Sequence, residues 1–418
     1  MSDPRAHTDV VGCDVAICGG GLVGATLALA LADLGLGVVL IEAHPFGTSG
    51  QPSFDDRTTA LSNGSRRIFE ALHVWPLLER DATAIRRIHV SDRGRFGFAR
   101  LDAAEQGLSA LGFVVVNRAM GAALWRRLEQ SSVRILAPAR VRGMQLVEDR
   151  QRIDCDLGPQ GSASVAPRLA IAADGAQSVL REAAGIDAQT WNYEQTALVT
   201  NVLTQRFHDH VAYERFTPAG PIALLPMSEG RLGLIWTFTS EVAPTIAQVD
   251  DAAFLARLQD AFGFRLGRFM KVGARQLYPL SLTRAEDHVA ERLAIVGNAA
   301  QTLHPIAGQG FNLGLRDAAS LAEVLADGRA QQQDAFDPGD GLWLERYREW
   351  RVADRSNIVR FTDGLVRLFA QPLGPIKMLR DVGMLAFDLM PAAKGALSQL
   401  SLGAAGRIPK LARGASLH

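Results

Sequence analysis

A glycine motif between two apolar runs constrains the fold more than any other feature of the sequence. The motif G-x-G-x-x-G occupies residues 19–24, directly after the apolar run 14–18 (DVAIC), which predicts a buried strand. A stretch of small residues over 22–34 predicts a helix, and the run 38–42 (VVLIE) predicts a second strand. Because a strand–helix–strand unit of this kind pairs its strands in parallel, we expect an α/β fold with a parallel sheet.

The glycines of this motif are suited to bind the pyrophosphate of a dinucleotide. Among Gly19, Gly21 and Gly24, one turns the chain, one lets the backbone approach a pyrophosphate, and one lets helix and strand pack closely. The helix amino terminus offers unpaired N–H groups to phosphates, and Glu42 is placed to accept hydrogen bonds from ribose hydroxyls. The motif therefore predicts dinucleotide binding rather than a plain packing turn, without distinguishing FAD from NAD.

Composition and charge argue against several other classes of protein. The 418 residues carry 44 basic and 44 acidic side chains, whereas a nucleic-acid-binding protein concentrates positive charge. The 3 cysteines show no paired metal-ligand spacing and cannot form a disulfide framework. His208 and His210 have an H-x-H spacing, but no third ligand stands near them in the sequence. We expect no nucleic-acid partner and no metal site.

The amino-terminal part of the chain raises the question of a membrane segment. Residues 15–32 carry no charge, but the glycines inside this stretch weaken any spanning helix, so a strand, turn and helix explain it better. The first ten residues have no apolar signal core, which predicts a cytoplasmic protein.

The middle of the chain changes to short extended segments separated by Gly and Pro. In 231–238 (RLGLIWTF) the apolar residues alternate, which is typical of an antiparallel sheet with one apolar face. Trp236 and Phe238 on this face are interpreted as core rather than as cavity lining. The segment 88–102 resembles a hairpin, and we expect it to join the same sheet.

The second domain is therefore expected to be an insertion into the first. The predicted boundaries are a discontinuous cofactor-binding domain over 1–76, 107–182 and 274–355, a sheet domain over 77–106 and 183–273, and a helical carboxyl-terminal region over 356–418.

Three further motifs follow predicted strands. DDRTTALS occupies 55–62, Asp174-Gly175 closes the strand of 168–175, and a glycine-rich segment over 297–318 closes another. Just before a helix, this last segment contains residues that favour close backbone approach: Pro305, Gly308, Gly310 and Asn312. Two glycine-rich cradles in one chain fit a single extended cofactor that is contacted at both ends.

Together these motifs resemble the class A flavoprotein aromatic hydroxylases, which have the p-hydroxybenzoate hydroxylase-like fold. The resemblance extends from about residue 14 to about 317, with the motifs in the family's order. Within this family the chain is similar to the ubiquinone-biosynthesis hydroxylases. Most members have Asp where this chain has Asn298, and often His where it has Gln301. The branch that hydroxylates 6-methoxyphenols has Asn at this position, as this chain does at Asn298. The resemblance therefore narrows the assignment to that branch of the family.

The resemblance implies FAD as the cofactor and NAD(P)H as the co-substrate. Besides the glycines of 19–24 and Glu42, it implies that Arg57 lies near the flavin or nicotinamide and that Arg118 holds the phosphate or ribityl region. Asp174 would serve both FAD and NAD(P)H, and Asn298 a ribityl hydroxyl. Contacts around the isoalloxazine are expected from Pro305, Gly308, Gly310, Phe311 and Asn312. Surface ion pairs for the arginines and simple turns for the other segments stay open as alternatives.

The family's chemistry implies a function as well. We expect an FAD-dependent monooxygenase that uses O2 and a flavin 4a-hydroperoxide to hydroxylate a prenylated phenol, 2-polyprenyl-6-methoxyphenol, to the corresponding 1,4-benzoquinol in ubiquinone biosynthesis. The alternatives are a same-fold oxidoreductase or hydroxylase acting on another aromatic or prenyl substrate, or an FAD-bound structural subunit of the biosynthetic complex. No residue is assigned as the base that ionises the phenol.

A prenylated substrate needs an apolar path and a route to the membrane. We expect the apolar face of the inserted sheet to line this path. Residues 389–418 contain no Asp or Glu but several basic residues, namely Lys394, Arg407, Lys410 and Arg413. This stretch fits peripheral contact with the inner membrane or with other ubiquinone-biosynthesis proteins. It equally fits a basic tail that packs on its own domain or is disordered.

Overall fold

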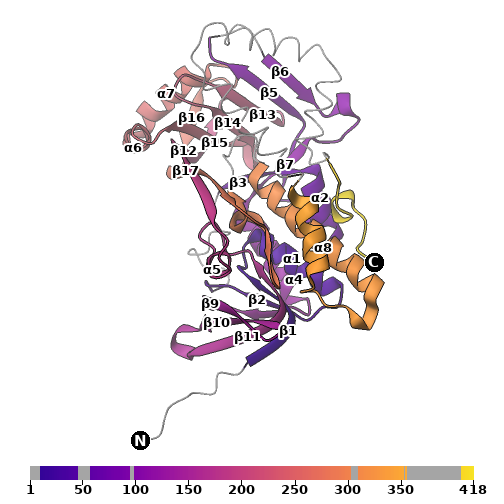
Figure 1. The fold of residues 1–418 in the computed structure, drawn as a ribbon. Coiled ribbons are helices and arrows are strands. Elements are labelled where there is room, and N and C mark those ends of the chain that lie inside the picture. The colour runs from indigo at the N-terminus through magenta and orange to yellow at the C-terminus, as the bar shows by residue number, and fades with distance from the viewer. Residues whose placement is uncertain (1–9, 46–56, 95–97, 303–308, 353, 355–405) are drawn as a thin grey trace, which may run out of the picture.

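The structure is a computed structural model that describes residues 10–45, 57–94, 98–302, 309–352, 354 and 406–418. Two large sheets and one small sheet organise these residues (Figure 1). The predicted site residues Pro305 and Gly308, and most of the predicted helical region 356–418, lie outside the described residues.

The first sheet has eight strands in the order β18-β19-β11-β1-β2-β8, and β10 and β9 extend it from β11. Its strands are β1 (Val10–Cys18), β2 (Val38–Ile41), β8 (Arg134–Leu136), β9 (Arg140–Val147), β10 (Arg150–Asp156), β11 (Ser162–Ala172), β18 (Val289–Ala290) and β19 (Leu293–Ile295). The pairs β1–β2, β1–β11, β2–β8 and β11–β19 are parallel. The predicted strand–helix–strand opening is confirmed.

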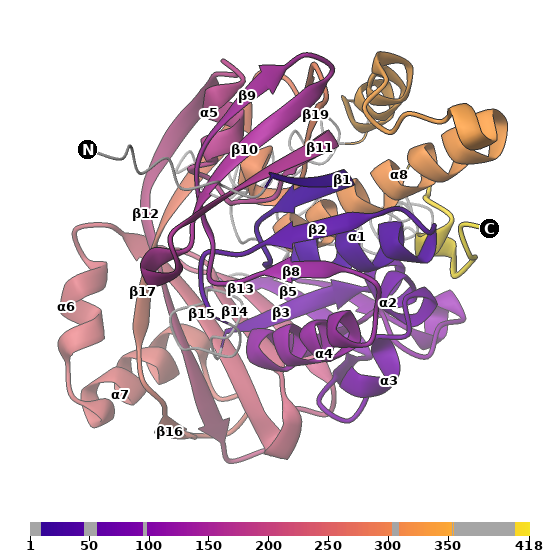
Figure 2. The ribbon, with the colours of Figure 1, turned by 90° about the horizontal axis from the view of Figure 1, so that it is seen from below.

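Helices cover one face of this sheet. They are α1 (Leu22–Asp33), α4 (Asn117–Glu129) and α8 (Gln309–Gln332). Alternate residues of β1 and β2, such as Val15 and Leu40, pack into one core with these helices. Figure 2 shows α1 lying beside β2. The other face, which includes Ala16 and Cys18, packs against β10 and against α5 (Val179–Ala183). Because both faces are covered, the central segments 15–18, 38–41 and 169–172 are apolar throughout, as is typical of parallel sheets.

The second sheet has nine strands in the order β20-β17-β12-β15-β14-β13-β5-β6, with β16 paired to β12. Its strands are β5 (Arg87–Asp92), β6 (Phe98–Asp102), β12 (Ala188–Thr204), β13 (Val211–Phe216), β14 (Ile222–Pro226), β15 (Arg231–Thr239), β16 (Phe269–Val272), β17 (Gln276–Ala285) and β20 (Gln301–Thr302). The predicted hairpin of 88–102 is confirmed as β5 and β6. However, β5 pairs with β13 in parallel, so the sheet is not purely antiparallel. A long crossover joins these two strands, and such a connection permits parallel pairing.

The apolar face of this sheet is covered by α6 (Ala243–Gln248) and α7 (Asp251–Phe262). On β15, Leu234 is 0% exposed, and the Trp236 ring lies 6.0 Å from that of Phe254 on α7. The core role predicted for Trp236 and Phe238 is therefore confirmed. Our expectation that this face lines a path for a prenyl tail is wrong, because two helices occupy it.

A three-stranded sheet faces the other side of the nine-stranded sheet. It consists of β3 (Thr58–Ser62), β7 (Gly112–Val116) and β4 (Thr83–Ile85). Between β3 and β4 the chain forms the helices α2 (Asn63–Ala71) and α3 (Trp75–Leu78). Ile85 and Val114 of the small sheet pack with Ala212 of β13. A Cβ added at Gly233 of β15 would lie 2.7 Å from the Thr58 hydroxyl oxygen. The nine-stranded sheet thus has α6 and α7 on one face and the three-stranded sheet on the other.

Residues 406–418 pack on α8. They contain the short 3-10 helix Leu411–Arg413 and no α-helix. The Arg407 guanidinium pairs with Glu323 at 3.3 Å, and the Lys410 ammonium pairs with Asp327 at 3.1 Å. For these residues the structure matches the alternative in which the basic tail packs on its own domain. Among the described residues, no helix is long and apolar enough to cross a membrane.

Substitutions on the two faces of β15 test the assignment of the core. We expect Leu234→Ala, on the face covered by α7, to lower the free energy of unfolding by about 3 kcal/mol, because it removes fully buried methyl groups and leaves a cavity. The adjacent Ile235→Ala, on the partly exposed face, should cost less than about 1.5 kcal/mol. Urea unfolding measures both values, and equal losses would contradict the assigned faces.

Candidate cofactor and substrate site

The glycine turn lies at the carboxyl end of β1, where the chain comes into contact with the end of β11. Gly19 has a φ of +107°, and a Cβ there would lie 2.3 Å from the Ala173 carbonyl oxygen. A Cβ at Gly24 would lie 2.0 Å from the Gly19 carbonyl oxygen. These contacts admit only glycine at both positions. Gly21 is the N-cap of α1 and makes no side-chain cap, so the helix begins with its first N–H groups uncapped by a side chain.

Glu42, which directly follows β2, is hydrogen-bonded to this turn. Its side chain is 7% exposed. One carboxylate oxygen accepts the Gly20 N–H at 2.7 Å, and the other accepts the His44 N–H at 2.9 Å. Each oxygen retains further acceptor capacity. Sequence reasoning placed Glu42 at this turn, and its contact with a ribose stays a prediction.

Asp174 follows β11 and lies beside the same turn. Its Oδ2 accepts the Val179 N–H at 2.8 Å at the start of α5, while its Oδ1 is buried without a hydrogen-bond partner. Burial raises the pKa of the Asp174 carboxyl. A buried acceptor without a donor is costly, and such atoms occur where a ligand supplies the donor.

The second glycine-rich segment reaches the first through α1. Gly297 begins the 3-10 turn Gly297–Ala299 after β19 with a φ of +61°. A Cβ at Gly297 would lie 3.3 Å from Val23 of α1, and one at Gly314 would lie 2.9 Å from the same side chain. The two glycine motifs are therefore adjacent, as a single extended cofactor requires. Asn298 is exposed at this edge.

Asn312 connects the start of α8 to β3. Its amide nitrogen donates to the Ala60 carbonyl at 2.9 Å, and its oxygen accepts the Ser62 N–H at 2.8 Å. The side chain thus holds two elements together. Phe311 packs against the core next to it, and Gly310 is partly exposed. The predicted contacts of these residues with a flavin stay predictions.

The structure brings the two predicted arginines into one region. The Arg57 carbonyl accepts the Asn117 N–H at 2.8 Å, and Asn117 precedes Arg118 at the start of α4. The Arg57 guanidinium lies 4.7 Å from the centre of the Tyr278 ring on β17. Arg57 therefore stands between the cofactor-binding part and the nine-stranded sheet, whereas Arg118 is exposed.

Sequence reasoning missed a row of side chains on the open face of the nine-stranded sheet. Four aliphatic residues, which we call the aliphatic strip, lie side by side across neighbouring strands. They are Val90, Ala223, Ile235 and Val199. Each is partly exposed, and none belongs to a packed core cluster among the described residues. Glu214 of β13 lies within this row, between Val90 and Ala223.

The strip lies opposite the cofactor residues. Gly233 lies two residues before Ile235 on the same face of β15, and its backbone is in contact with Thr58. On the same face of β17, the Tyr278 ring is in contact with Arg57. The segment Arg57–Thr58 therefore crosses the face that carries the strip. The sequence of 211–216 (VAYERF) places Glu214 on the strand face opposite to Tyr213 and Arg215, but it does not show which face is open.

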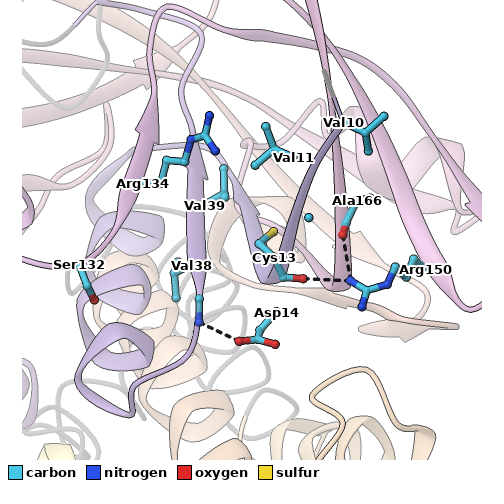
Figure 3. Close-up of a pocket in the computed structure, with 12 residues that line it drawn as sticks. Val10, Val11, Cys13, Asp14, Val38, Val39, Ser132, Arg134, Arg150 and Ala166 are labelled. Carbon is cyan, nitrogen blue, oxygen red and sulfur yellow. Dashed lines mark hydrogen bonds between the residues drawn. The ribbon is translucent and has the colours of Figure 1, made fainter. Parts of the chain in front are cut away.

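A separate pocket lies at the amino ends of β1 and β2 (Figure 3). There Arg150 donates to the Cys13 carbonyl, and the Asp14 carboxylate accepts the Gly37 N–H at 2.8 Å. Ligands of such sheets bind at the carboxyl ends of the strands. This pocket is at the wrong end for the cofactor.

Comparison with known families identifies the kind of domain that this fold represents. The family of the FAD binding domain matches residues 12–335. The chain is 38% identical to the ubiquinone hydroxylase UbiL of Rhodospirillum rubrum, over 97% of this chain and 93% of that protein. It is 31% identical to the 3-demethoxyubiquinol 3-hydroxylase of Escherichia coli, over 93% and 98% of the two chains. It is 30% identical to the human mitochondrial ubiquinone biosynthesis monooxygenase COQ6, over 93% and 92%.

Solved structures show the same fold. The p-nitrophenol 4-monooxygenase PnpA of Pseudomonas putida superposes with a TM-score of 0.77 at 18% identity, covering 95% of this chain and 100% of that one. PqsL of Pseudomonas aeruginosa, a probable FAD-dependent monooxygenase, gives 0.69 at 22% identity, over 90% and 100%. The predicted p-hydroxybenzoate hydroxylase-like fold and the FAD cofactor are confirmed. The chain belongs to the FAD-dependent monooxygenases, in the family of the ubiquinone-biosynthesis hydroxylases.

Proposed function

We propose that this enzyme hydroxylates 2-polyprenyl-6-methoxyphenol to the corresponding 1,4-benzoquinol, with NAD(P)H and O2 as co-substrates. The observation that carries the proposal is the aliphatic strip opposite Arg57, which offers an apolar wall for an aromatic ring beside the cofactor residues. The names of the relatives, a ubiquinone hydroxylase and a 3-demethoxyubiquinol 3-hydroxylase, support a ubiquinone precursor as substrate.

The residues of the site fit FAD. The uncapped amino end of α1 at Gly21 suits the pyrophosphate, and Glu42 has acceptor capacity left for a ribose. The unpartnered Oδ1 of Asp174 suits a donor of the cofactor, and the exposed side chains of Arg118 and Asn298 are accessible to a ligand. The chemistry that bound FAD would supply is the uptake of electrons from NAD(P)H and the activation of O2.

The chain's own residues position the substrate and limit the access of water. A phenol ring lying on the aliphatic strip would be held in a fixed orientation relative to the cofactor, which accelerates the transfer of oxygen to one ring carbon. Apolar side chains such as Ile235 and Val199 would exclude water from the reacting atoms. The prenyl tail would leave along this face and not along the face covered by α6 and α7.

The surroundings of the enzyme belong to the same proposal. We place it in the cytoplasm, in peripheral contact with the inner membrane or with other ubiquinone-biosynthesis proteins, through residues 389–418. Within the described part of this stretch Arg413 is exposed, whereas Arg407 and Lys410 pair with α8. Flotation of the purified protein with anionic vesicles measures the membrane contact.

Substitution of a glycine in the turn tests the cofactor site. Gly21 has φ −65° and ψ 179°, a backbone conformation that other residues adopt, so Gly21→Val should fold. Its branched side chain would stand where the backbone approaches the pyrophosphate, and we expect the affinity for FAD to fall at least about tenfold. Flavin absorbance of the purified protein measures the occupancy.

The matched control for this variant is Gly12→Val. Gly12 is exposed near the other end of β1, and a Cβ there would meet no atom within 4 Å. This variant should keep the FAD content of the unchanged protein. Normal occupancy in Gly21→Val would contradict the proposed pyrophosphate site.

The reaction itself is tested with labelled oxygen. We expect the holoenzyme, supplied with NAD(P)H, 2-polyprenyl-6-methoxyphenol and 18O2, to form a benzoquinol that carries one 18O atom, because a monooxygenase inserts one atom of O2. Mass spectrometry measures the label and the ring position. A product without label would indicate a flavin oxidoreductase, and a reaction that requires added partner proteins would indicate a structural subunit.

A further inference from the structure

Glu214 points away from α7 and towards the cofactor-binding part of the protein. Its neighbours on β13 both contact α7. The Tyr213 ring lies 5.5 Å from the Phe262 ring, and the Arg215 guanidinium donates to the Ala261 carbonyl at 3.1 Å. Because side chains alternate along a strand, Glu214 lies on the opposite face. Ala212, two residues earlier on that face, packs against the three-stranded sheet.

The surroundings of the Glu214 carboxylate are aliphatic. Val90 of β5 and Ala223 of β14 are its direct neighbours across the sheet. No hydrogen bond or ion pair connects Glu214 to the described part of the chain. Its side chain nevertheless keeps some accessible surface, so it is not enclosed in close-packed core.

Other titratable groups approach this face without pairing with Glu214. On β5, Asp92 lies two residues beyond Val90 on the same face. Across the sheet, Arg57 lies over Tyr278. From the three-stranded sheet, the Ile85–Val114 cluster presents apolar side chains. Desolvation alone raises the pKa of Glu214 to about 8.

We propose that Glu214 is the base that accepts the proton of the substrate's phenol hydroxyl. This inference rests on the proposed function and deepens it, since it assigns a role that sequence reasoning left open. The phenol O–H bond breaks, an O–H bond forms on the Glu214 carboxylate, and the electron pair stays on the phenolate oxygen. A phenolate ring is richer in electrons and therefore accepts an electrophilic oxygen atom more readily.

The position of Glu214 suits this role. Thr58 touches β15, and β13 lies two strands away, which corresponds to about 10 Å. The surface between them is formed by Ala223 and Ile235 of the aliphatic strip. A ring lying on these side chains would have the Glu214 carboxylate at its edge.

The same desolvation means that ionised Glu214 lowers the stability of the folded protein at high pH. A carboxyl whose folded pKa is raised from 4.5 to about 8 stabilises the protein most when it is protonated. Stability is therefore lost as the pH rises through this range. A residue retained for stability alone would not carry this cost, so Glu214→Gln should unfold at a higher temperature than the unchanged protein at pH 9.

The experiment compares Glu214→Gln with Glu241→Gln, an exposed control just beyond β15. The unchanged holoenzyme should hydroxylate its prenylated phenol faster as the pH rises through about 8. We expect Glu214→Gln to lose this rise in hydroxylation rate with pH and to hydroxylate the phenol about 100-fold more slowly. Its oxidation of NAD(P)H should continue, and the control should behave as the unchanged enzyme does.

A second measurement does not depend on turnover. In the oxidised holoenzyme with 13C-labelled glutamate carboxyls, one resonance absent from Glu214→Gln should titrate near pH 8 and shift when 2-methoxyphenol is added. An unchanged rate and pH profile in Glu214→Gln, or a resonance that does not respond to this phenol, would overturn the inference. If the unchanged enzyme instead forms no labelled product from 18O2, the proposed function fails, and the resonance still reports whether Glu214 contacts a phenol.

Discussion

The packing of the second glycine-rich segment against Val23, which lies within the first glycine motif, is the contact on which the proposed cofactor site depends. Val23 is the second residue of α1, and the backbones of Gly297 and Gly314 approach its side chain closely enough that any added Cβ would crowd it. Asp317, fully buried on α8, fixes this arrangement, since it accepts the Gly297 N–H at 3.0 Å and the Arg351 guanidinium at 2.9 Å. A larger residue at Gly314 would separate α8 from α1 and so separate the two ends of the FAD site.

Sequence patterns predicted those parts of the structure in which backbone geometry dictates the residue type. The turn of 19–24 was recognisable because Gly19 and Gly24 touch other backbone atoms. The alternation in 231–238 likewise identified the buried face of β15, since burial and the two-residue period of a strand coincide. Glu42 and Asp174 were singled out for a related reason, because each follows a strand at the edge of the sheet where ligands bind.

Long-range arrangement was not accessible in the same way. A local pattern in 88–102 indicates a hairpin, but nothing in it shows that β5 pairs in parallel with β13. Alternation in β15 shows an apolar face, but not that α7 covers it, and this led to the wrong path for the prenyl tail. The aliphatic strip escaped notice because its members come from four strands, each contributing one residue, and only the register brings them together.

The protein treats its buried charges in two different ways, and the difference separates structure from chemistry. Where α8 packs on the helix of 341–352, Arg351 bonds to Asp317 and to Asp354, and Arg316 also reaches Asp354, so each carboxylate has a cationic partner. Leaving one of these charges unpaired would be strongly destabilising. At the site, in contrast, the Oδ1 of Asp174 and the carboxylate of Glu214 have no such partner in the described chain, although burial raises both pKa values. Under the functions we propose, the cofactor and the phenol would bring the donors that these two carboxylates lack within the described chain.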